Sequence, residues 1–406
     1  MILRNIGQLA MCRESGGQGE IHLIPNAALA CEGGRIVWVG RDSDLPVSAS
    51  THEEIDAAGR LVVPGLIDCH THLAFGGWRA DEFEQRLRGR TYLEIAAAGG
   101  GIRSTVEATR QISESELVRR CQLFLNEMLA LGITTVECKS GYGLDVDTEL
   151  KLLRVYREVA RCQPVKIVPT FLAHIVPVEY LSRRDAYLNL LCTNLIPSIA
   201  RDRLAESCDV FVEESAFTVD EARAILEAAA RYGLKRRVHA DQLTDKGAAE
   251  LAAETKALSA DHLEQVSSAG IEALRRAGVI AVSLPLASLY LHTPPMPARR
   301  LIDAGVPVAV ATDFNPGSAP SFHLPLAMML ACNLQRMTPA EALKGATIYA
   351  ARALGVEADR GSLEEGKAAD FLLIDGEDVN HWLYHFRANA CDEVFIDGVR
   401  LPPAPR

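Results

Sequence analysis

The sequence predicts an α/β fold, a (β/α)8 TIM-like barrel, because strand-like apolar runs alternate with segments of helical periodicity between residues 61 and 340. Residues with metal-binding or acid–base side chains follow several of these runs, at the strand ends where such barrels carry their active sites. The eight expected strands are Leu61–Leu73, Ile133–Lys139, Val165–His174, Cys208–Glu213, Arg237–Gln242, Ala257–Leu263, Val279–Leu284 and Val306–Asp313.

Helices are expected between these strands, and several begin at a residue suited to capping. Ser113 with Glu116 predicts a capping box, and Thr218 and Thr244 are further expected caps. The helical periodicity is clearest in the segments Glu114–Leu131, Asp147–Arg161, Val219–Tyr232 and Thr244–Glu254.

The two ends of the chain show a different pattern, with short β runs separated by glycine-rich turns. Gly34–Gly40 is one such run, and Asp370–Ile374 and Glu393–Asp397 repeat the style near the other end. Neither end has enough strands for a stable sheet of its own. We therefore expect residues 1–60 and 360–406 to form one small composite β-sandwich beside a barrel of residues 61–359.

The composition is that of a soluble globular enzyme, with 48% hydrophobic and 23% charged residues among 406. A formal net charge of −11 argues against nucleic acid or an anionic membrane as a partner. The ten cysteines form no C-x-x-C pair, which disfavours a cysteine zinc site and indicates reduced thiols. Since no leader-like segment and no long apolar run is found, a cytoplasmic protein is expected.

A candidate metal site comes from the residues at the strand ends. His70 and His72 project to the same face of the first strand, because residues two apart on a strand point the same way. With His239 and Asp313 they make a ligand set for one divalent ion, and imidazole and carboxylate suit zinc, iron or manganese. Such an ion leaves a position for water and lowers the pKa of that water toward about 7.

Two alternatives concern the same strand ends. His262 is expected to stay unligated and to polarise a carbonyl or move a proton, but a role as a fifth ligand is open. A bridged two-metal centre is less favoured because the fourth strand, Cys208–Glu213, offers no lysine that could be carboxylated. Glu213 itself remains a possible contact for a second ion.

The chain resembles the imidazolonepropionase branch of the amidohydrolase superfamily over nearly its whole length. The motifs that carry the resemblance are DCHTHLAFGGWRADEFEQRLRGRTYLEI, AGGGIRSTVEATR, ECKSGYGLD, RVHADQLTD, SADHLE and ATDFNPGS. The resemblance implies a metal-dependent barrel of the amidohydrolase type, with one Zn or Fe ion per chain, and a homodimer. It also implies hydrolytic opening of 4-imidazolone-5-propanoate to N-formimidoyl-L-glutamate, the third step of histidine degradation.

The resemblance further assigns roles to individual residues. Arg79 matches the family's arginine for the substrate carboxylate, and a guanidinium pairs with a carboxylate through two hydrogen bonds. His262, Asp313 and Gln242 are the expected catalytic residues. The remaining implied substrate contacts are Tyr142, His174, Gln242, Asn315, Gly317 and Ser318.

Two departures from the family pattern bear on this assignment. The segment Phe171–His174 is one residue shorter than the usual form, which affects the placing of His174. Position 242 is glutamine where many relatives have glutamate, and a glutamine cannot carry a proton at neutral pH. Proton transfer would then rest with Asp313 and His262, which weakens a deaminase-like interpretation.

Two other functions compete with ring opening. A related amidohydrolase would act on another cyclic amide or an aminated ring, and release of ammonia would reveal deamination. A metal-free barrel kept as a binding or assembly protein is the alternative from a different class, and it conflicts with intact candidate ligands on three strands.

Overall fold

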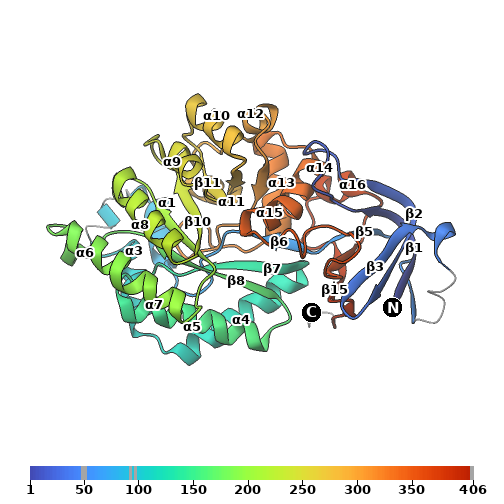
Figure 1. Cartoon of the computed structure of the whole chain (residues 1–406), viewed down its shortest axis with the longest axis horizontal. Coiled ribbons are helices and arrows are strands. Elements are labelled where there is room, and N and C mark those ends of the chain that lie inside the picture. The colour runs from blue at the N-terminus through green and yellow to red at the C-terminus, as the bar shows by residue number, and fades with distance from the viewer. Residues whose placement is uncertain (47–52, 91–93, 96–97, 403–406) are drawn as a thin grey trace.

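A closed ring of eight parallel strands forms the centre of the larger part of the molecule in the computed structural model, which describes residues 1–46, 53–90, 94–95 and 98–402 (Figure 1). Neighbours in the sheet are also neighbours along the chain. The strands are β6 (Leu66–Asp68), β7 (Ile133–Lys139), β8 (Lys166–Ala173), β9 (Ser207–Phe211), β10 (Lys235–Ala240), β11 (Ser259–His262), β12 (Ile280–Ser283) and β13 (Val308–Val310). The predicted barrel is confirmed.

The ring closes between its first and last strands just beyond their carboxyl ends. Thr71 and Phe314 form a parallel bridge. The His72 amide donates to the Phe314 carbonyl at 2.8 Å, and the Asp313 amide donates to the His70 carbonyl at 3.0 Å. The backbone that closes the barrel therefore carries three of the predicted metal ligands.

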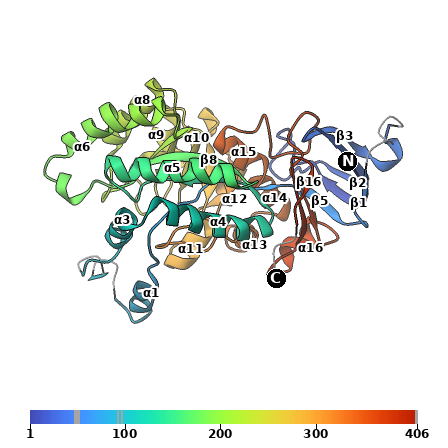
Figure 2. The same ribbon diagram turned by 90° about the horizontal axis from the view of Figure 1, so that it is seen from below.

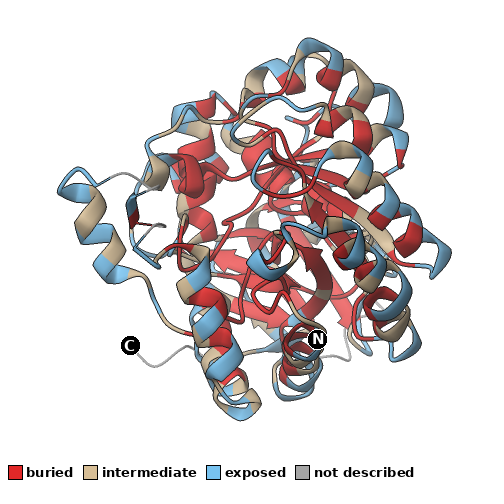
Figure 3. Ribbon diagram, turned by 90° about the vertical axis from the view of Figure 1, so that its left-hand side faces the viewer, coloured by how far each residue is buried: buried red, intermediate tan, exposed pale blue. Residues whose placement is uncertain are grey.

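Helices cover the outside of the ring, with their apolar faces inward and their polar faces in solvent (Figure 3). Figure 2 shows α4 and α5 side by side along the barrel, and α1 and α3 on an excursion between β6 and α4. The main covering helices are α4 (Glu114–Ala130), α5 (Val146–Cys162), α8 (Val219–Arg231), α9 (Ala248–Glu254), α10 (Ser268–Ala277), α13 (Leu324–Gln335) and α15 (Ile348–Leu354). In the described part of the chain, no helix combines the length and the apolar character needed to cross a bilayer.

The predicted caps have different outcomes. Thr218 forms a full capping box with Glu221 at the start of α8. Ser113 accepts the Glu116 amide as expected, but the Glu116 carboxylate pairs with arginines of the same helix. Thr244 as a cap is wrong: α9 begins at Ala248, and the Thr244 amide and hydroxyl instead donate to Glu213.

The two ends of the chain together build the predicted small β domain beside the barrel, and its strands form one mixed eight-stranded sheet. Its buried face has its own apolar core, in which Phe371 and Phe395 stack. The strands are β1 (Ile2–Ala10), β2 (Leu23–Glu32), β3 (Arg35–Arg41), β4 (Glu54–Asp56), β5 (Leu61–Pro64), β14 (Phe371–Ile374), β15 (Cys391–Ile396) and β16 (Val399–Arg400). The domain boundaries after residues 60 and 359 stay a prediction.

The single strand expected over Leu61–Leu73 is in fact divided at Gly65. Its first part, β5, pairs with β1 and β14 in the end sheet, whereas β6 pairs with β7 in the barrel. A Cβ on Gly65 would lie 2.2 Å from the Thr134 hydroxyl, so only glycine fits between the two sheets. The division anchors the first barrel strand, and thus His70 and His72, to the end sheet.

Candidate metal centre and its surroundings

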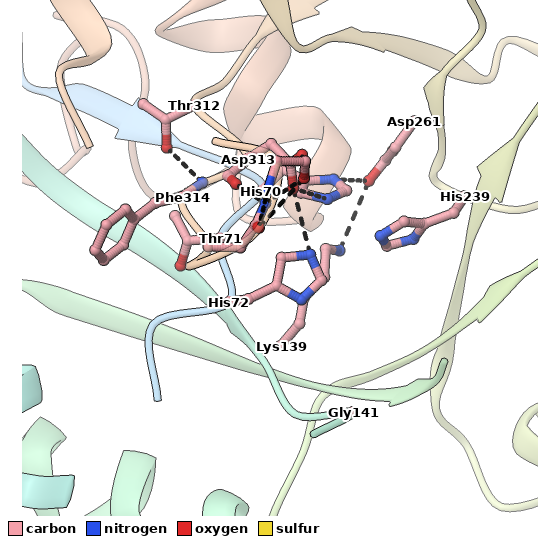
Figure 4. Close-up of polar contacts among 12 residues, drawn as sticks. His70, Thr71, His72, Lys139, Gly141, His239, Asp261, Thr312, Asp313 and Phe314 are labelled. Carbon is pink, nitrogen blue, oxygen red and sulfur yellow. Dashed lines mark hydrogen bonds and ion pairs between the residues drawn. The ribbon is translucent and has the colours of Figure 1, made fainter. Parts of the chain in front are cut away.

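Four histidine rings meet at the carboxyl ends of the barrel strands. The His70 ring centroid lies 5.4 Å from that of His72, 4.6 Å from that of His239 and 5.6 Å from that of His262. Asp313 Oδ1 lies 3.4 Å from Nε2 of both His70 and His72 (Figure 4). The structure thus brings together all four predicted ligands, and His262 beside them.

The donor set fits a divalent cation. Ligand atoms of His70, His72 and His239 lie within 4.8 Å of one another, as do those of His70, His262 and Asp313. His70 Nε2, His72 Nδ1 and His239 Nε2 are buried, and none of them has a hydrogen-bond partner among the described residues. Buried nitrogen atoms without a partner are costly unless an ion or ligand satisfies them. Three imidazoles and a carboxylate suit zinc or iron.

Burial and neighbouring charges set the pKa values of these rings. Burial lowers the pKa of His239 to about 4 and holds that of His72 well below its usual range. Burial and Lys139 oppose protonation of His70, but its hydrogen bond to Asp261 and the nearby Asp313 carboxylate raise its pKa to about 9. Despite its burial, Asp313 has a lowered pKa because the two neighbouring histidines favour its charged form. His72, His239 and Asp313 are therefore in the protonation states that metal binding requires.

A layer of buried charges supports the ligands from inside the barrel. His70 Nδ1 lies 2.6 Å from Asp261 Oδ2, and His239 Nδ1 lies 3.0 Å from Asp209 Oδ2. Because the Asp261 carboxylate accepts the Nδ1–H of His70, it fixes the orientation of that ring and leaves Nε2 free for a metal, and Asp209 places a negative charge beside His239.

Two cations balance these carboxylates. Lys139 Nζ lies 2.7 Å from Asp209 and 2.7 Å from Glu137, and Arg237 Nη2 lies 3.0 Å from Asp261. The side chains of this network have no solvent exposure. Arg237 also donates to the carbonyls of Cys69 and Ala353, so it ties the network to the backbone just before His70.

Asp68 supports the remaining ligand through the backbone. Its carboxylate accepts the amide of Thr312 at 3.1 Å and the hydroxyl at 2.6 Å, directly before Asp313. Burial raises the pKa of Asp68 to about 7, against these hydrogen bonds. Asp313 itself has a φ of 57°, a conformation that turns the chain sharply at the end of the strand.

Tyr142 and His174 border the histidine cluster on one side. The His174 ring lies 5.7 Å from the His72 ring and 5.5 Å from the Tyr142 ring, and its Nδ1 lies 3.1 Å from the Gly141 carbonyl. Burial lowers the pKa of His174 to about 3. The loop that carries Tyr142 is held in place by the buried Glu149, which accepts the amides of Gly141, Gly143 and Leu144.

Arg79 lies against Gly317, in the turn that Asn315 and Ser318 form directly after Asp313. The Asn315 side chain accepts the amides of Gly317 and Ser318, each at 2.8 Å, and donates to the Asp313 carbonyl at 2.6 Å. The Ser318 hydroxyl lies 3.5 Å from Asp313 Oδ2. The turn that follows the last barrel strand therefore connects Asp313 to Arg79.

Gln242 and Glu213 both belong to the surroundings of the loop that follows His239. Glu213 accepts the amides of Leu243 and Thr244 and so holds the loop after His239. The half-buried Gln242 side chain makes no hydrogen bond or ion pair to another residue within the described ranges. The side-chain amide of Gln242 is therefore available to bind a ligand.

Known proteins resemble the chain over most of its length. The model of the amidohydrolase family matches residues 61–401. An imidazolonepropionase of Myxococcus xanthus (strain DK1622) is 50% identical, over 89% of this chain and 86% of its own. One of Anaeromyxobacter dehalogenans (strain 2CP-C) is 46% identical, over 100% of this chain and 96% of its own. The chain belongs to the imidazolonepropionases of the amidohydrolase family.

Solved structures support the fold of this imidazolonepropionase-family chain. A triazine hydrolase from Arthobacter aurescens has 19% identity and a TM-score of 0.77, covering 100% of this chain and 95% of that one. A 5-methylcytosine deaminase from Klebsiella pneumoniae has 18% identity and a TM-score of 0.73, covering 99% of this chain and 98% of that one. Both likenesses concern the amidohydrolase barrel with its added sheet.

Sequence reasoning missed the buried charge layer of this family member. Its members are ionisable residues in strands that the barrel buries on both faces: Asp68, Glu137, Lys139, Asp209, Arg237 and Asp261. Such strands are normally continuous apolar runs. Several charged positions at period two within apolar runs were therefore a readable signal, but which charge meets which depends on the closed ring.

Proposed function

We propose that this chain hydrolyses 4-imidazolone-5-propanoate to N-formimidoyl-L-glutamate, the third step in the degradation of histidine to glutamate. One water molecule is consumed. Its oxygen bonds to the ring carbonyl carbon, the bond from that carbon to the ring nitrogen breaks, and the nitrogen takes up a proton. The product then carries a new carboxylate and an opened formimidoyl group, and no oxidant or reductant is needed.

One divalent ion, zinc or iron, is proposed to be held by His70, His72, His239 and Asp313. When bound, such an ion lowers the pKa of a water molecule and polarises a carbonyl. The unpaired ring nitrogens described above support this assignment. Asp261 and Asp209 keep two of the rings oriented while the ligand set is loaded.

The proton movements are assigned to Asp313 and His262. Asp313 is buried and ionised, so it can accept a proton from the attacking water and pass it toward the leaving nitrogen. His262 stands 5.6 Å from His70 and 5.3 Å from His239, measured between ring centroids, and is proposed to face the carbonyl oxygen. The Gln242 side chain is proposed to form a hydrogen bond with the imidazolone ring of the substrate without taking a proton.

Substrate binding is assigned to the two sides of the cluster. Arg79 pairs with the propionate, since a guanidinium binds a carboxylate through two parallel hydrogen bonds. Tyr142 and His174 hold the imidazolone ring opposite, while Asn315, Gly317 and Ser318 contact substrate or opened product. The neutral state of His174 suits a hydrogen bond to an uncharged ring.

The meeting of three histidines and one aspartate at the strand ends, with Arg79 held against the turn that follows Asp313, supports the proposal. The test is to incubate metal-replete protein with the imidazolone, generated in place from urocanate by urocanate hydratase because it is unstable, and to identify the product by mass and NMR. N-Formimidoyl-L-glutamate is expected. Release of ammonia without the opened product would instead indicate a deaminase, and no turnover by metal-loaded protein would refute the assignment.

The finer features of the proposal have separate tests. Elemental analysis of protein purified without added metal distinguishes zinc from iron. The family resemblance favours a homodimer, which sedimentation equilibrium tests. A cytoplasmic location agrees with ten cysteines that are all unpaired thiols, since disulfides are rare in reducing compartments. The net charge of −11 disfavours nucleic acid as a partner, which a gel-shift assay tests.

A further inference from the structure

The guanidinium of Arg79 occupies the place where a side chain at position 317 would be. A Cβ on Gly317 would lie 1.2 Å from Arg79 Nη2, 2.3 Å from Cζ and 3.0 Å from Nε. These distances are far below van der Waals contact, and they involve three atoms of the guanidinium group. Any residue larger than glycine would therefore displace the cation.

The backbone of Gly317 does not by itself require glycine. Its φ lies outside the left-handed region in which glycine is favoured, unlike eighteen other glycines in the described chain. Its amide donates to Asn315 Oδ1 at 2.8 Å, and its carbonyl accepts from Arg86 Nη2 at 3.5 Å. Gly317 is thus held through both its amide and its carbonyl, and the absence of a side chain leaves room for the Arg79 guanidinium.

Arg79 retains hydrogen-bonding capacity for a ligand. Its side chain is 15% exposed, and the nearest carboxylate oxygen, in Glu82, lies 3.8 Å from Nε. That Nε is buried without a hydrogen-bond partner within the described part of the chain. The adjoining hollow is lined by Trp78, Phe83, Tyr290, Pro316 and Pro320. A partly desolvated cation beside an apolar hollow favours an anionic guest with an apolar stem.

We infer that Gly317 is a specificity-determining positioning residue: its missing side chain seats the Arg79 guanidinium and so makes this site select substrates with a carboxylate tail. The inference rests on the proposed function and deepens it. Gly317 acts here through Arg79, and Asn315 and Arg86 keep the seat in place.

The test is a double-mutant cycle with Gly317→Ala and Arg79→Ala. Each single variant is expected to raise KM for the imidazolone by about 10- to 100-fold, the value of one or two charge-assisted hydrogen bonds. Because the alanine at 317 acts by moving the guanidinium, adding it to Arg79→Ala should change KM by less than about twofold. Gly17→Ala is the matched control, since a Cβ there meets no atom within 4 Å.

A second measurement separates recognition from general damage. Binding of imidazole-4-propanoate and of its neutral amide to the metal-loaded enzyme is compared by calorimetry. Wild type should prefer the carboxylate, and Gly317→Ala should reduce that preference about 10-fold or more with metal content unchanged. A purely structural defect would weaken both probes equally.

Several results would overturn the inference. Multiplicative effects in the cycle, an unchanged carboxylate preference, or loss of metal in Gly317→Ala would each do so. If Gly317→Ala alone fails to fold, the double variant should fold, because removing the guanidinium removes the clash. Failure of both variants to fold would refute the inference that Gly317 makes room for Arg79. A wild-type enzyme that does not open the imidazolone ring would refute the proposed function, whereas an active wild type with a multiplicative cycle refutes only this inference.

Discussion

Replacing Asp261 by asparagine tests whether the buried charge layer prepares the metal site. The side chain keeps its volume but loses its charge. Its Oδ2 lies 2.6 Å from His70 Nδ1, 3.0 Å from Arg237 Nη2 and 3.6 Å from Lys139 Nζ. The substitution therefore removes the anion that fixes the His70 tautomer, while the ring still has a neutral neighbour.

Two effects of this substitution act in the same direction on metal affinity. Loss of the carboxylate that hydrogen-bonds to a metal-binding histidine weakens metal binding by about 10- to 100-fold, or about 1.4 to 2.7 kcal/mol. Removing a negative charge near the cation adds to the loss. Folding should survive, because Glu137 and Asp209 still balance Lys139 and Arg237. We expect a decrease of about 1.5 to 3 kcal/mol in the free energy of unfolding, the value of one hydrogen bond to a charged group.

The assay is a competition titration of metal-free protein against a chromophoric chelator with Zn²⁺ at constant pH. Urea unfolding of the metal-free protein gives the stability change. Asp220→Asn is the control, because that carboxylate is 93% exposed and pairs with Arg223 on the same helix. Equal zinc affinity in Asp261→Asn and wild type would show that the charge layer does not prepare the site.

Three further predictions concern other parts of the molecule. His239→Ala should lower both metal content and rate, since it removes one of three clustered imidazoles, and full activity without metal would contradict the ligand role. His174→Gln should reduce the pH dependence of stability of metal-free protein. With a folded pKa of about 3 against about 6.5 unfolded, His174 binds a proton only after unfolding, so its contribution is present above pH 6.5 and lost toward pH 3. Between pH 5 and 6 the slope should fall by up to about 1.4 kcal/mol per pH unit, measured by urea unfolding, and an unchanged slope would count against a buried neutral ring. Gly65→Ala should cost about 1 to 3 kcal/mol by overcrowding Thr134, and Thr134→Ala in the same chain should restore part of it; equal stability of Gly65→Ala and wild type would contradict the close approach of the two sheets.

Local sequence was sufficient to predict the repeating units of the barrel. Apolar runs of strand length and helices of period 3.6 depend on neighbours a few residues away, and α8 begins at Val219, directly after the predicted cap Thr218. The strand division at Gly65 could not be read in this way. The run Leu61–Leu73 is continuous in the sequence, and only the pairing of β5 with β14, from the far end of the chain, separates it.

The cap at Thr244 illustrates how tertiary contacts override local preference. Thr244 is a good cap by residue type, but its amide and hydroxyl donate to the carboxylate of Glu213, two residues beyond the end of β9. The loop after His239 is therefore held by Glu213. A helix capped by Thr244 would begin at Asp245, whereas α9 begins at Ala248.

By itself the sequence determined which residues stand at strand ends, including the pair His70 and His72, because alternation along a strand is a local property. Only the tertiary structure decided which groups meet. Asp261 reaches His70 across 191 residues of chain, and Gly317, on the turn after the last barrel strand, makes room for Arg79, which follows the first. Such contacts arise from the closure and register of the ring, which bring distant charges within hydrogen-bonding distance and remove them from water.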